Sequence, residues 1–351
     1  MVVVIMAGGI GSRFWPRSRT KSPKHLLSIT TENTMLENTI KRAESITSKD
    51  KIYVVTSSNQ VEMVKEKSSI LEENIISEPF GKNTAAAIGL AAIHLEMDEV
   101  MVVLPADHYV RNVERFSEII NKGKDHIENE AESLVTIGIE PTHPETGYGY
   151  IQLGEEIDSN MYKVENFAEK PNLKTAIRFI ENGDFIWNSG IFLWKVSTIL
   201  SNIKTHLPDL YENLIEIKES IGTNLYNSVL GRVYKDIRSI SIDYGIMEKA
   251  TNVKSMRGDF GWSDVGSWFE LHRFKEKDSN GNVASDNFIS IDTQNCYIYS
   301  DDSDKLITTI GVENIAIIDT KDAMLVTDLS KSQEVKTLVD KLKAKDLNKY
   351  L

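Results

Sequence analysis

The chain has 351 residues, of which 41% are hydrophobic and 26% are charged, a composition typical of a globular protein with about two domains. Its net charge of −12 argues against nucleic-acid binding and against attachment to an anionic membrane surface. No apolar run reaches the roughly 20 residues of a membrane span, and no secretory signal opens the sequence. Because Cys296 is the one cysteine, an internal disulfide framework is excluded, and we expect a cytoplasmic protein.

Short apolar runs alternate with segments of helical spacing over about the first 140 residues. The runs expected to form strands are Val2–Met6, Ile52–Thr56, Ile75–Ile76, Val100–Leu104 and Leu134–Ile139. The segments expected to form helices are Met35–Ala43, Thr84–Leu95 and Phe116–Glu128. This alternation predicts an α/β fold in which an open parallel sheet carries helices on both faces. Ligands of such sheets bind beyond the carboxyl ends of the strands.

The remainder of the chain is expected to form a mixed region and then a small second domain. Helices are expected at Leu173–Asn182, Val196–Thr205 and Leu210–Ser220. The polar stretch 277–282 marks a boundary, after which short strands are expected at Phe288–Ile291, Cys296–Tyr299, Ile315–Ile318 and Met324–Val326. A final amphipathic helix is expected at Ser332–Ala344. We therefore predict a larger domain, 1–282, and a small β-rich, β-helix-like domain, 283–351, in which no motif has a chemical role.

A glycine-rich loop, residues 7–13, follows the first predicted strand. Such a loop lets backbone N–H groups approach an anion closely. It is not a Walker loop, which ends in Gly-Lys-Ser/Thr, nor a dinucleotide loop, because Phe14 occupies the third glycine position. Glycines alone leave a plain structural turn equally open. Together with Arg13, Pro16 and Lys24 in this order, they favour a site for a triphosphate.

Eight stretches in order resemble the sugar-1-phosphate nucleotidyltransferase family. They are MAGGIGSRFWPRSRTKSPKHLL (6–27), SEPFGKNTAAA (77–87), LPADHYV (104–110), PETGYGYI (144–151), FAEKP (167–171), WNSGIFLW (187–194), SIDYGIMEK (241–249) and WSDVGSW (262–268). Within the family, residues 14–16 and 18–19 resemble the mannose-1-phosphate guanylyltransferases. The resemblance covers about residues 1–330, and His25, Ala168 and Gly245 depart from the residues usual in the family.

This resemblance implies a Rossmann-like open mixed sheet flanked by helices, as in nucleotidyltransferases. It implies transfer of a guanylyl group from GTP to α-D-mannose 1-phosphate, which yields GDP-mannose and pyrophosphate. The implied cofactor is Mg²⁺, and the implied assembly is a homodimer. A relative that uses glucose 1-phosphate or another nucleotide stays open, as does a non-catalytic homologue that binds a sugar nucleotide to regulate a partner.

On the nucleotide side, the resemblance assigns Arg13 and Lys24 to the triphosphate, and Asp107 and Asp264 to the metal. By position alone, capping of a helix or turn is favoured over metal binding for Asp107, and the alternative for Asp264 is a solvent-facing turn residue. The expected nucleotide-binding residues are Ala7, Gly8, Gly9, Gly11, Ser12, Arg13, Lys24, Glu78, Asn83, Thr84, Pro105 and Asp107. Glu78 or backbone carbonyls are expected to accept from the N–H groups of guanine, whereas Asn83 or Thr84 is also the expected N-cap of the alanine-rich helix.

On the sugar side, the resemblance assigns Lys170 to the phosphate of the sugar phosphate and Glu169 to the sugar hydroxyls. The expected sugar-phosphate-binding residues are Gly147, Tyr148, Glu169, Lys170, Asn188 and Asp243. Asp243 is equally an expected helix cap. The expected catalytic residues are Arg13, Lys24, Asp107, Lys170 and Asp264. The seven histidines lack metal-binding spacing, which argues against a histidine-based metalloenzyme.

Overall fold

The computed structural model describes all of residues 1–351, and these residues divide into two compact units. The first unit comprises Met1–Gly8 and Glu37–Trp262. The second comprises Gly9–Leu36 and Ser263–Leu351. The glycine-rich loop therefore groups with the C-terminal region, from which more than 200 residues of sequence separate it. The predicted division into domains 1–282 and 283–351 stays a prediction.

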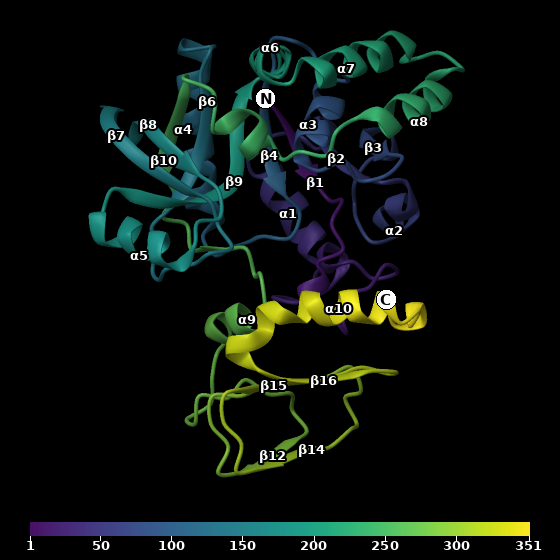
Figure 1. Ribbon diagram of the computed structural model, residues 1–351, viewed down its shortest axis with the longest axis vertical. Coiled ribbons are helices and arrows are strands. Elements are labelled where there is room, and N and C mark those ends of the chain that lie inside the picture. The colour runs from purple at the N-terminus through teal and green to yellow at the C-terminus, as the bar shows by residue number, and fades with distance from the viewer. The chain divides into compact units, whose positions relative to one another are not determined.

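A mixed sheet of nine strands forms the centre of the first unit (Figure 1). Its strand order is β3-β2-β1-β4-β9-β6-β10-β8-β7. The strands are β1 (Val2–Met6), β2 (Ile52–Ser57), β3 (Ile75–Glu78), β4 (Val100–Pro105), β6 (Leu134–Ile139), β7 (Tyr150–Asp158), β8 (Met161–Ala168), β9 (Phe185–Lys195) and β10 (Val253–Arg257). β1 pairs in parallel with both β2 and β4, and β2 with β3, which confirms the predicted α/β class.

β9 lies between β4 and β6 in the sheet and runs antiparallel to both. β4 and β6 are consecutive in the predicted series of apolar runs. Leu193 is in register with Val102 of β4 on one side and with Val135 of β6 on the other. β9 is buried along most of its length, so its apolar side chains fill both faces of the sheet at its centre. β6 consequently does not pair with β4, and the sheet is mixed where the apolar runs alone predicted parallel pairing.

Helix α3 (Thr84–Ala92) explains the alanine-rich stretch after β3. All residues from Ala85 to Ala92 are buried, so this part of α3 has no solvent-facing side. At Gly89 an added Cβ would stand 2.5 Å from Leu214 Cδ1 of α7 (Pro208–Ser220), so a larger residue would require the Leu214 side chain to shift. Small side chains therefore let α3 lie between the sheet and the helices above it, within the main apolar core.

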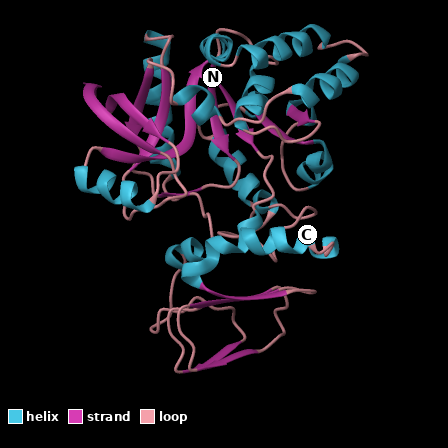
Figure 2. Cartoon of the chain, in the orientation of Figure 1, coloured by secondary structure: helices cyan, strands magenta, loops and turns pink.

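The remaining helices of the chain are shown in cyan in Figure 2. They are α1 (Met35–Glu44), α2 (Val61–Glu66), α4 (Val113–Asn129), α5 (Leu173–Asn182), α6 (Val196–His206), α7 (Pro208–Ser220), α8 (Tyr226–Asp236), α9 (Trp268–Phe274) and α10 (Val335–Ala344). α4 begins earlier than predicted because the side chain of Asn112 accepts from the Arg115 N–H and caps it. α8 has no counterpart among the predicted helices. None of the helices has the length and apolar composition that crossing a membrane requires.

The second unit contains short strands and the C-terminal helix. Its strands are β12 (Phe288–Ile291), β13 (Tyr297–Ser300), β14 (Ile307–Ile310), β15 (Ile315–Asp319) and β16 (Met324–Asp328). β12 pairs in parallel with β14, and β13 with β15, while β16 runs antiparallel to β15. The predicted β-rich region is confirmed. The predicted final helix is observed as a 3₁₀ segment, η7 (Leu329–Glu334), followed by α10.

Candidate active site

The glycine-rich loop folds back on itself within the second unit. Gly11 has a φ of 72°, in the left-handed region that favours glycine, and a Cβ at this position would collide with Cβ of Lys24. The Lys24 N–H donates to the Ile10 carbonyl at 2.9 Å, and the Ser18 hydroxyl donates to the Gly11 carbonyl at 2.6 Å. The glycine-rich loop and Lys24, which the sequence predicted to act together, are thus in direct contact through their backbones.

Lys24 is buried and its ammonium group is held beside Asp264 of the same unit. Lys24 Nζ donates to the backbone carbonyl of Asp264 at 2.7 Å and lies 5.3 Å from the centre of the Phe14 ring. Val265 has a φ of 46°, and its N–H donates to the Ser263 hydroxyl, so a tight turn presents the Asp264 carbonyl to the lysine. Two residues predicted to serve the triphosphate and the metal therefore lie together.

Arg13 belongs to a short 3₁₀ helix, η1 (Ser12–Phe14), that begins after Gly11. Its Nε is buried and has no hydrogen-bond partner within the protein. A buried donor without a partner costs free energy, and such donors are common where a ligand supplies the acceptor. Gly9 has open space where a Cβ would stand, so nothing in the fold crowds the backbone of the loop there.

In the first unit, the end of β1 lies next to the carboxylate of Glu78, at the end of β3. Glu78 Oε2 is 3.5 Å from the position of a Cβ on Gly8, and its other oxygen accepts from the Tyr234 hydroxyl at 2.7 Å. Both side chains are buried, and burial raises the pKa of Glu78 to about 6. Ala7 donates its N–H to the Val55 carbonyl, which fixes the start of the loop on the sheet.

Asn83 caps α3, which is the role expected of Asn83 or Thr84 as the alternative to ligand binding. Asn83 Oδ1 accepts from the Thr84 N–H at 2.9 Å at the start of α3. Thr84 Oγ1 accepts from the Ile242 N–H at 2.8 Å, and the Ala85 N–H donates to the Ile240 carbonyl. These bonds connect the start of α3 to the segment that carries Asp243. Nucleotide binding by Asn83 and Thr84 stays a prediction.

Four of the predicted sugar residues or their neighbours meet at one end of the sheet. Asn188 of β9 donates from Nδ2 to Asp243 Oδ1 at 2.8 Å and accepts at Oδ1 from the Gly190 N–H. A Cβ on Gly149 would stand 2.5 Å from Glu169 Oε2 and 3.3 Å from Asn188 Cβ, so only glycine leaves room for both side chains. Burial, and then the nearby charge of Glu169, raises the pKa of Asp243 to about 6.

Lys170 lies at the exposed margin of this cluster. Its ammonium is paired with Glu169, whose side chain is only 6% exposed, whereas the lysine side chain is 53% exposed. The Lys170 N–H donates to the Tyr148 carbonyl, and the Tyr148 ring lies 5.1 Å from the ring of Trp187. A cation is therefore held at a solvent-facing position beside buried acceptors, an arrangement suited to a phosphate attached to a sugar.

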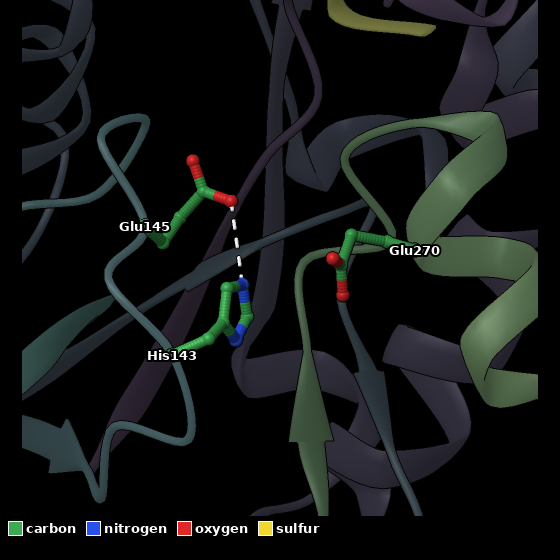
Figure 3. Close-up of side chains that lie close together, drawn as sticks. All are labelled: His143, Glu145 and Glu270. Carbon is green, nitrogen blue, oxygen red and sulfur yellow. Dashed lines mark ion pairs between the residues drawn. The ribbon is translucent and has the colours of Figure 1, made fainter. Parts of the chain in front are cut away.

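The loop that carries Gly147 is held by Glu145. Glu145 Oε1 accepts from the Gly147 N–H at 2.7 Å, and Oε2 lies 3.5 Å from His143 Nε2 (Figure 3). The His143 ring in turn lies 5.0 Å from the ring of Trp187. Glu270, drawn in the same figure, belongs to α9 of the second unit, where it accepts from Arg273. Nothing in the sequence motif singled out His143 or Glu145 as supports of the loop.

Asp107 follows β4 and belongs to the first unit. His108 Nε2 is 4.0 Å from Asp107 Oδ1, and His108 Nδ1 accepts from Trp262 Nε1 at 3.2 Å. A Cβ on Gly190 would stand 3.5 Å from Pro105 Cγ and 3.9 Å from His108 Cε1. The predicted nucleotide residue Pro105 thus lies beside Gly190, two residues after the predicted sugar residue Asn188.

The predicted site residues fall into two groups. The second unit holds Gly9, Gly11, Ser12, Arg13, Lys24 and Asp264, while the first unit holds Ala7, Gly8, Glu78, Asn83, Thr84, Pro105, Asp107, Gly147, Tyr148, Glu169, Lys170, Asn188 and Asp243. Asp107 and Asp264 belong to different groups, so their joint role stays a prediction. Sequence reasoning missed Tyr234, which sits on the helix α8 that it also missed.

Two family models match the chain. The model for nucleotidyl transferases matches residues 2–281, and a model for the MannoseP isomerase/GMP-like beta-helix domain matches residues 286–342. The first match alone spans most of the sequence. The chain belongs to the nucleotidyl transferase family.

Relatives of this family member are mannose-1-phosphate guanylyltransferases from enteric bacteria. One from Escherichia coli is 38% identical over 97% of this chain and 75% of its own length, and one from Salmonella muenchen is 40% identical over 100% and 75%. A solved structure described as mannose-1-phosphate geranyltransferase from Thermus thermophilus is 32% identical, with a TM-score of 0.88 over 97% of this chain and 99% of its own. The resemblance of the sequence motifs to this family is confirmed.

Asp243→Asn is expected to stabilise the ligand-free nucleotidyl transferase more at pH 8 than at pH 5. Because the pKa of Asp243 is raised from 3.8 to about 6, its contribution to stability is present below pH 3.8 and is lost as the pH rises through about 6. Asparagine keeps an acceptor for Asn188 and carries no charge. Denaturant unfolding should show a gain at pH 8 that exceeds the gain at pH 5 by roughly 1–2 kcal/mol.

Glu181→Gln, at an exposed position of α5, is the control for removal of one carboxylate from the surface. Equal effects of Asp243→Asn at pH 5 and pH 8 would show that the Asp243 carboxyl is not desolvated.

Proposed function

We propose that the chain transfers a guanylyl group from GTP to α-D-mannose 1-phosphate, forming GDP-mannose and pyrophosphate. The observation that carries this proposal is the identity of 38–40% over at least 97% of the chain to proteins named mannose-1-phosphate guanylyltransferase. The geometry supports this proposal in two places. A buried lysine contacts the glycine-rich loop, and a cluster of side chains in the first unit offers hydrogen-bond acceptors for sugar hydroxyl groups. The cytoplasmic location expected from the sequence belongs to the same proposal.

In the proposed reaction, a phosphate oxygen of the sugar phosphate attacks the α-phosphorus of GTP, and pyrophosphate leaves. The attacking phosphate is already ionised at neutral pH, so no protein nucleophile or general base is required. What the protein must supply is alignment of the reactants and relief of the repulsion between two polyanions. Arg13 and Lys24 would neutralise the triphosphate, and Lys170 the incoming phosphate. Glu169, Asn188 and Asp243 would orient the sugar through its hydroxyl groups.

The Glu78 carboxylate is the proposed acceptor for the guanine base. Guanine presents N–H donors on its Watson–Crick edge, and Glu78 lies beside Gly8, where the phosphate loop leaves the sheet. The Tyr234 hydroxyl donates to one carboxylate oxygen, and the Lys82 backbone N–H also donates to this carboxylate. The remaining lone pairs of its two oxygens can accept from the base. Because the pKa of Glu78 is about 6, the carboxylate is charged above that pH and accepts most strongly there.

Asp107 and Asp264 are the proposed Mg²⁺ ligands. The donor set fits this ion, because Mg²⁺ prefers carboxylate oxygens and is held by one or two carboxylates together with substrate phosphates. The Asp107 side chain is 36% exposed, so its oxygens are accessible to such a ligand. When bound, the ion supplies positive charge to the phosphates as negative charge develops on the leaving group.

A substrate panel tests the proposed function. Pyrophosphate release is measured with GTP, ATP, UTP and dTTP, each paired with mannose 1-phosphate and with glucose 1-phosphate. We expect the highest kcat/KM for GTP with mannose 1-phosphate. A preference for glucose 1-phosphate or another nucleotide would support another member of the family, and no turnover with measurable binding of GDP-mannose would support a non-catalytic homologue.

Lysine variants check the two phosphate assignments within this panel. Lys24→Ala should lower kcat/KM by about 10–100-fold with the KM for GTP raised, since a charge-assisted hydrogen bond is lost. Lys170→Ala should raise the KM for mannose 1-phosphate instead. Lys163→Ala on β8 is the control, because this exposed lysine pairs with Glu155 away from the cluster.

Removal of either proposed metal ligand should abolish most turnover. Asp107→Asn and Asp264→Asn are each expected to lower kcat by about 10²–10³-fold, the scale of one lost transition-state contact. The double variant should be little worse than either single variant, because groups that act as a unit are strongly non-additive. If the fold-losses in kcat of the two single variants multiplied in the double variant, the two carboxylates would serve separate functions. The same conclusion would follow if the kcat of Asp264→Asn depended on Mg²⁺ concentration as the wild-type kcat does.

A homodimer is the proposed assembly, with the outer face of β12 and β14 as its interface. Ile289, Ile291 and Ile310 are 62%, 58% and 72% exposed, and Ile291 is in register with Ile310. Adjacent exposed isoleucines on one face of a small sheet mark an interaction surface.

Sedimentation velocity at micromolar concentration should show a dimer for the unmodified chain and a monomer for the double variant Ile291→Lys with Ile310→Lys. Two buried lysines without partners would cost far more than a micromolar dimer can offset. Leu225→Lys, at an exposed position in the first unit, is the control and should leave the dimer intact. A dimer that persists in the double variant would exclude this face as the interface.

A further inference from the structure

Arg19 connects the glycine-rich segment to the C-terminal part of the second unit. Its Nη1 donates to Asp322 Oδ2 at 2.8 Å, and its Nη2 to Asp322 Oδ1 at 2.6 Å, which is the bidentate geometry that makes arginine–carboxylate pairs specific. Arg19 Nε donates to the Pro16 carbonyl at 2.8 Å, and Nη2 also to the Thr320 hydroxyl at 3.3 Å. One guanidinium thus joins the backbone of the segment at Pro16 to the turn after β15.

Aromatic contacts connect the same segment to residues near the chain's C-terminal end. Trp15 Nε1 donates to the Tyr350 carbonyl at 2.8 Å, and the Trp15 carbonyl accepts from Trp268 Nε1 at 3.3 Å. The Phe14 ring lies 4.8 Å from the Trp268 ring. In Figure 1 the purple N-terminal segment lies beside the yellow helix α10, and η1 packs against α10 and η7. The C-terminal region therefore surrounds η1.

Arg17 forms a second, weaker connection. Its guanidinium lies 4.1 Å from the centre of the Tyr299 ring of β13 and 3.9 Å from Asp301 Oδ1. Of the basic residues at the start of the chain, Arg17 and Arg19 are therefore turned toward the C-terminal strands. The positive charges of Arg17 and Arg19 interact with other groups of the protein, whereas Arg13 and Lys24 lie at the glycine-rich loop.

These connections lie within a few residues of the backbone that shapes the phosphate loop. η1 runs from Ser12 to Phe14, and the Lys24 N–H donates to the Ile10 carbonyl, which joins the two sides of the anchored stretch. Arg19 also exchanges two backbone hydrogen bonds with Ser22, two residues before Lys24. A movement of Pro16 and Arg19 would consequently change both ends of the loop.

We propose that Arg19 and Asp322 are positioning residues for the nucleotide, through which the C-terminal region holds the glycine loop in its triphosphate-binding shape. This inference rests on the proposed function, because it assigns GTP to that loop. It gives a role in substrate binding to a region whose sequence carries no motif of its own. Asp322 itself touches no reactant.

A partly exposed ion pair contributes little to global stability, so its loss separates positioning from folding. The Asp322 side chain is 45% exposed, and exposed pairs change the free energy of unfolding only slightly. Asp322→Ala should leave the melting temperature nearly unchanged. It should release the Arg19 guanidinium and loosen the backbone from Gly11 to Lys24.

The experiment combines steady-state kinetics with hydrogen exchange on the full chain. For Asp322→Ala we expect the KM for GTP to rise by about 2–10-fold while kcat and the KM for mannose 1-phosphate change by less than about 2-fold. Without any substrate, the Phe14, Ser18 and Lys24 amides, which donate within the loop, should exchange faster. Asp322→Glu keeps a carboxylate and should restore both properties.

The matched control is Asp259→Ala, which breaks a comparable exposed pair with Arg115 in the first unit. It should alter neither the KM for GTP nor exchange in the loop. Unchanged loop exchange in Asp322→Ala would overturn the inference, as would equal increases in both KM values with a lower melting temperature. Faster loop exchange in a protein that does not use GTP would leave the inference about loop shape standing and would reject the proposed function instead.

Discussion

Gly11 and Lys24 approach each other so closely that no side chain fits on residue 11, and the candidate triphosphate site depends on this approach. The left-handed backbone of Gly11 turns the chain into η1, and the return of the chain places the Lys24 N–H on the Ile10 carbonyl. Lys24 is then buried with its ammonium on the Asp264 carbonyl. One glycine conformation thus determines where the loop, its lysine and the turn of Asp264 meet.

The positive charge at the start of an acidic chain has two separate uses. Arg13 and Lys24 remain at the loop, and the buried Arg13 Nε has no acceptor within the protein. Arg17 and Arg19 bind Tyr299 and Asp322 of the C-terminal region. The same local composition therefore supplies both the cations of the candidate triphosphate site and the contacts that hold the second unit together, and only the contacts of each side chain distinguish the two.

Two buried carboxyl groups of the first unit, both predicted site residues, are costly to ionise because burial disfavours their charged form. Glu78 and Asp243 are carboxyl groups whose pKa values are both raised to about 6, chiefly by burial. Each has a neutral hydrogen-bond donor, Tyr234 for Glu78 and Asn188 for Asp243. Neutral partners orient these oxygens without cancelling their charge, which leaves them able to accept from a base or a sugar hydroxyl. Such local conflicts with stability are expected at functional sites.

The sequence by itself determined the local features: the buried strands, the glycine loop, an N-cap at Asn83 or Thr84 and the family, because each depends on residues that are close in the chain or on motifs in a recognisable order. It did not indicate that β9 separates β4 from β6, that Tyr234 holds Glu78, or that Asp322 binds Arg19. Those partners are separated by as many as 303 residues, and an exposed aspartate or a helical tyrosine has no local signal that names its partner. Only the tertiary structure decided these pairings, because they arise when apolar burial brings distant segments together and leaves their polar groups to find acceptors.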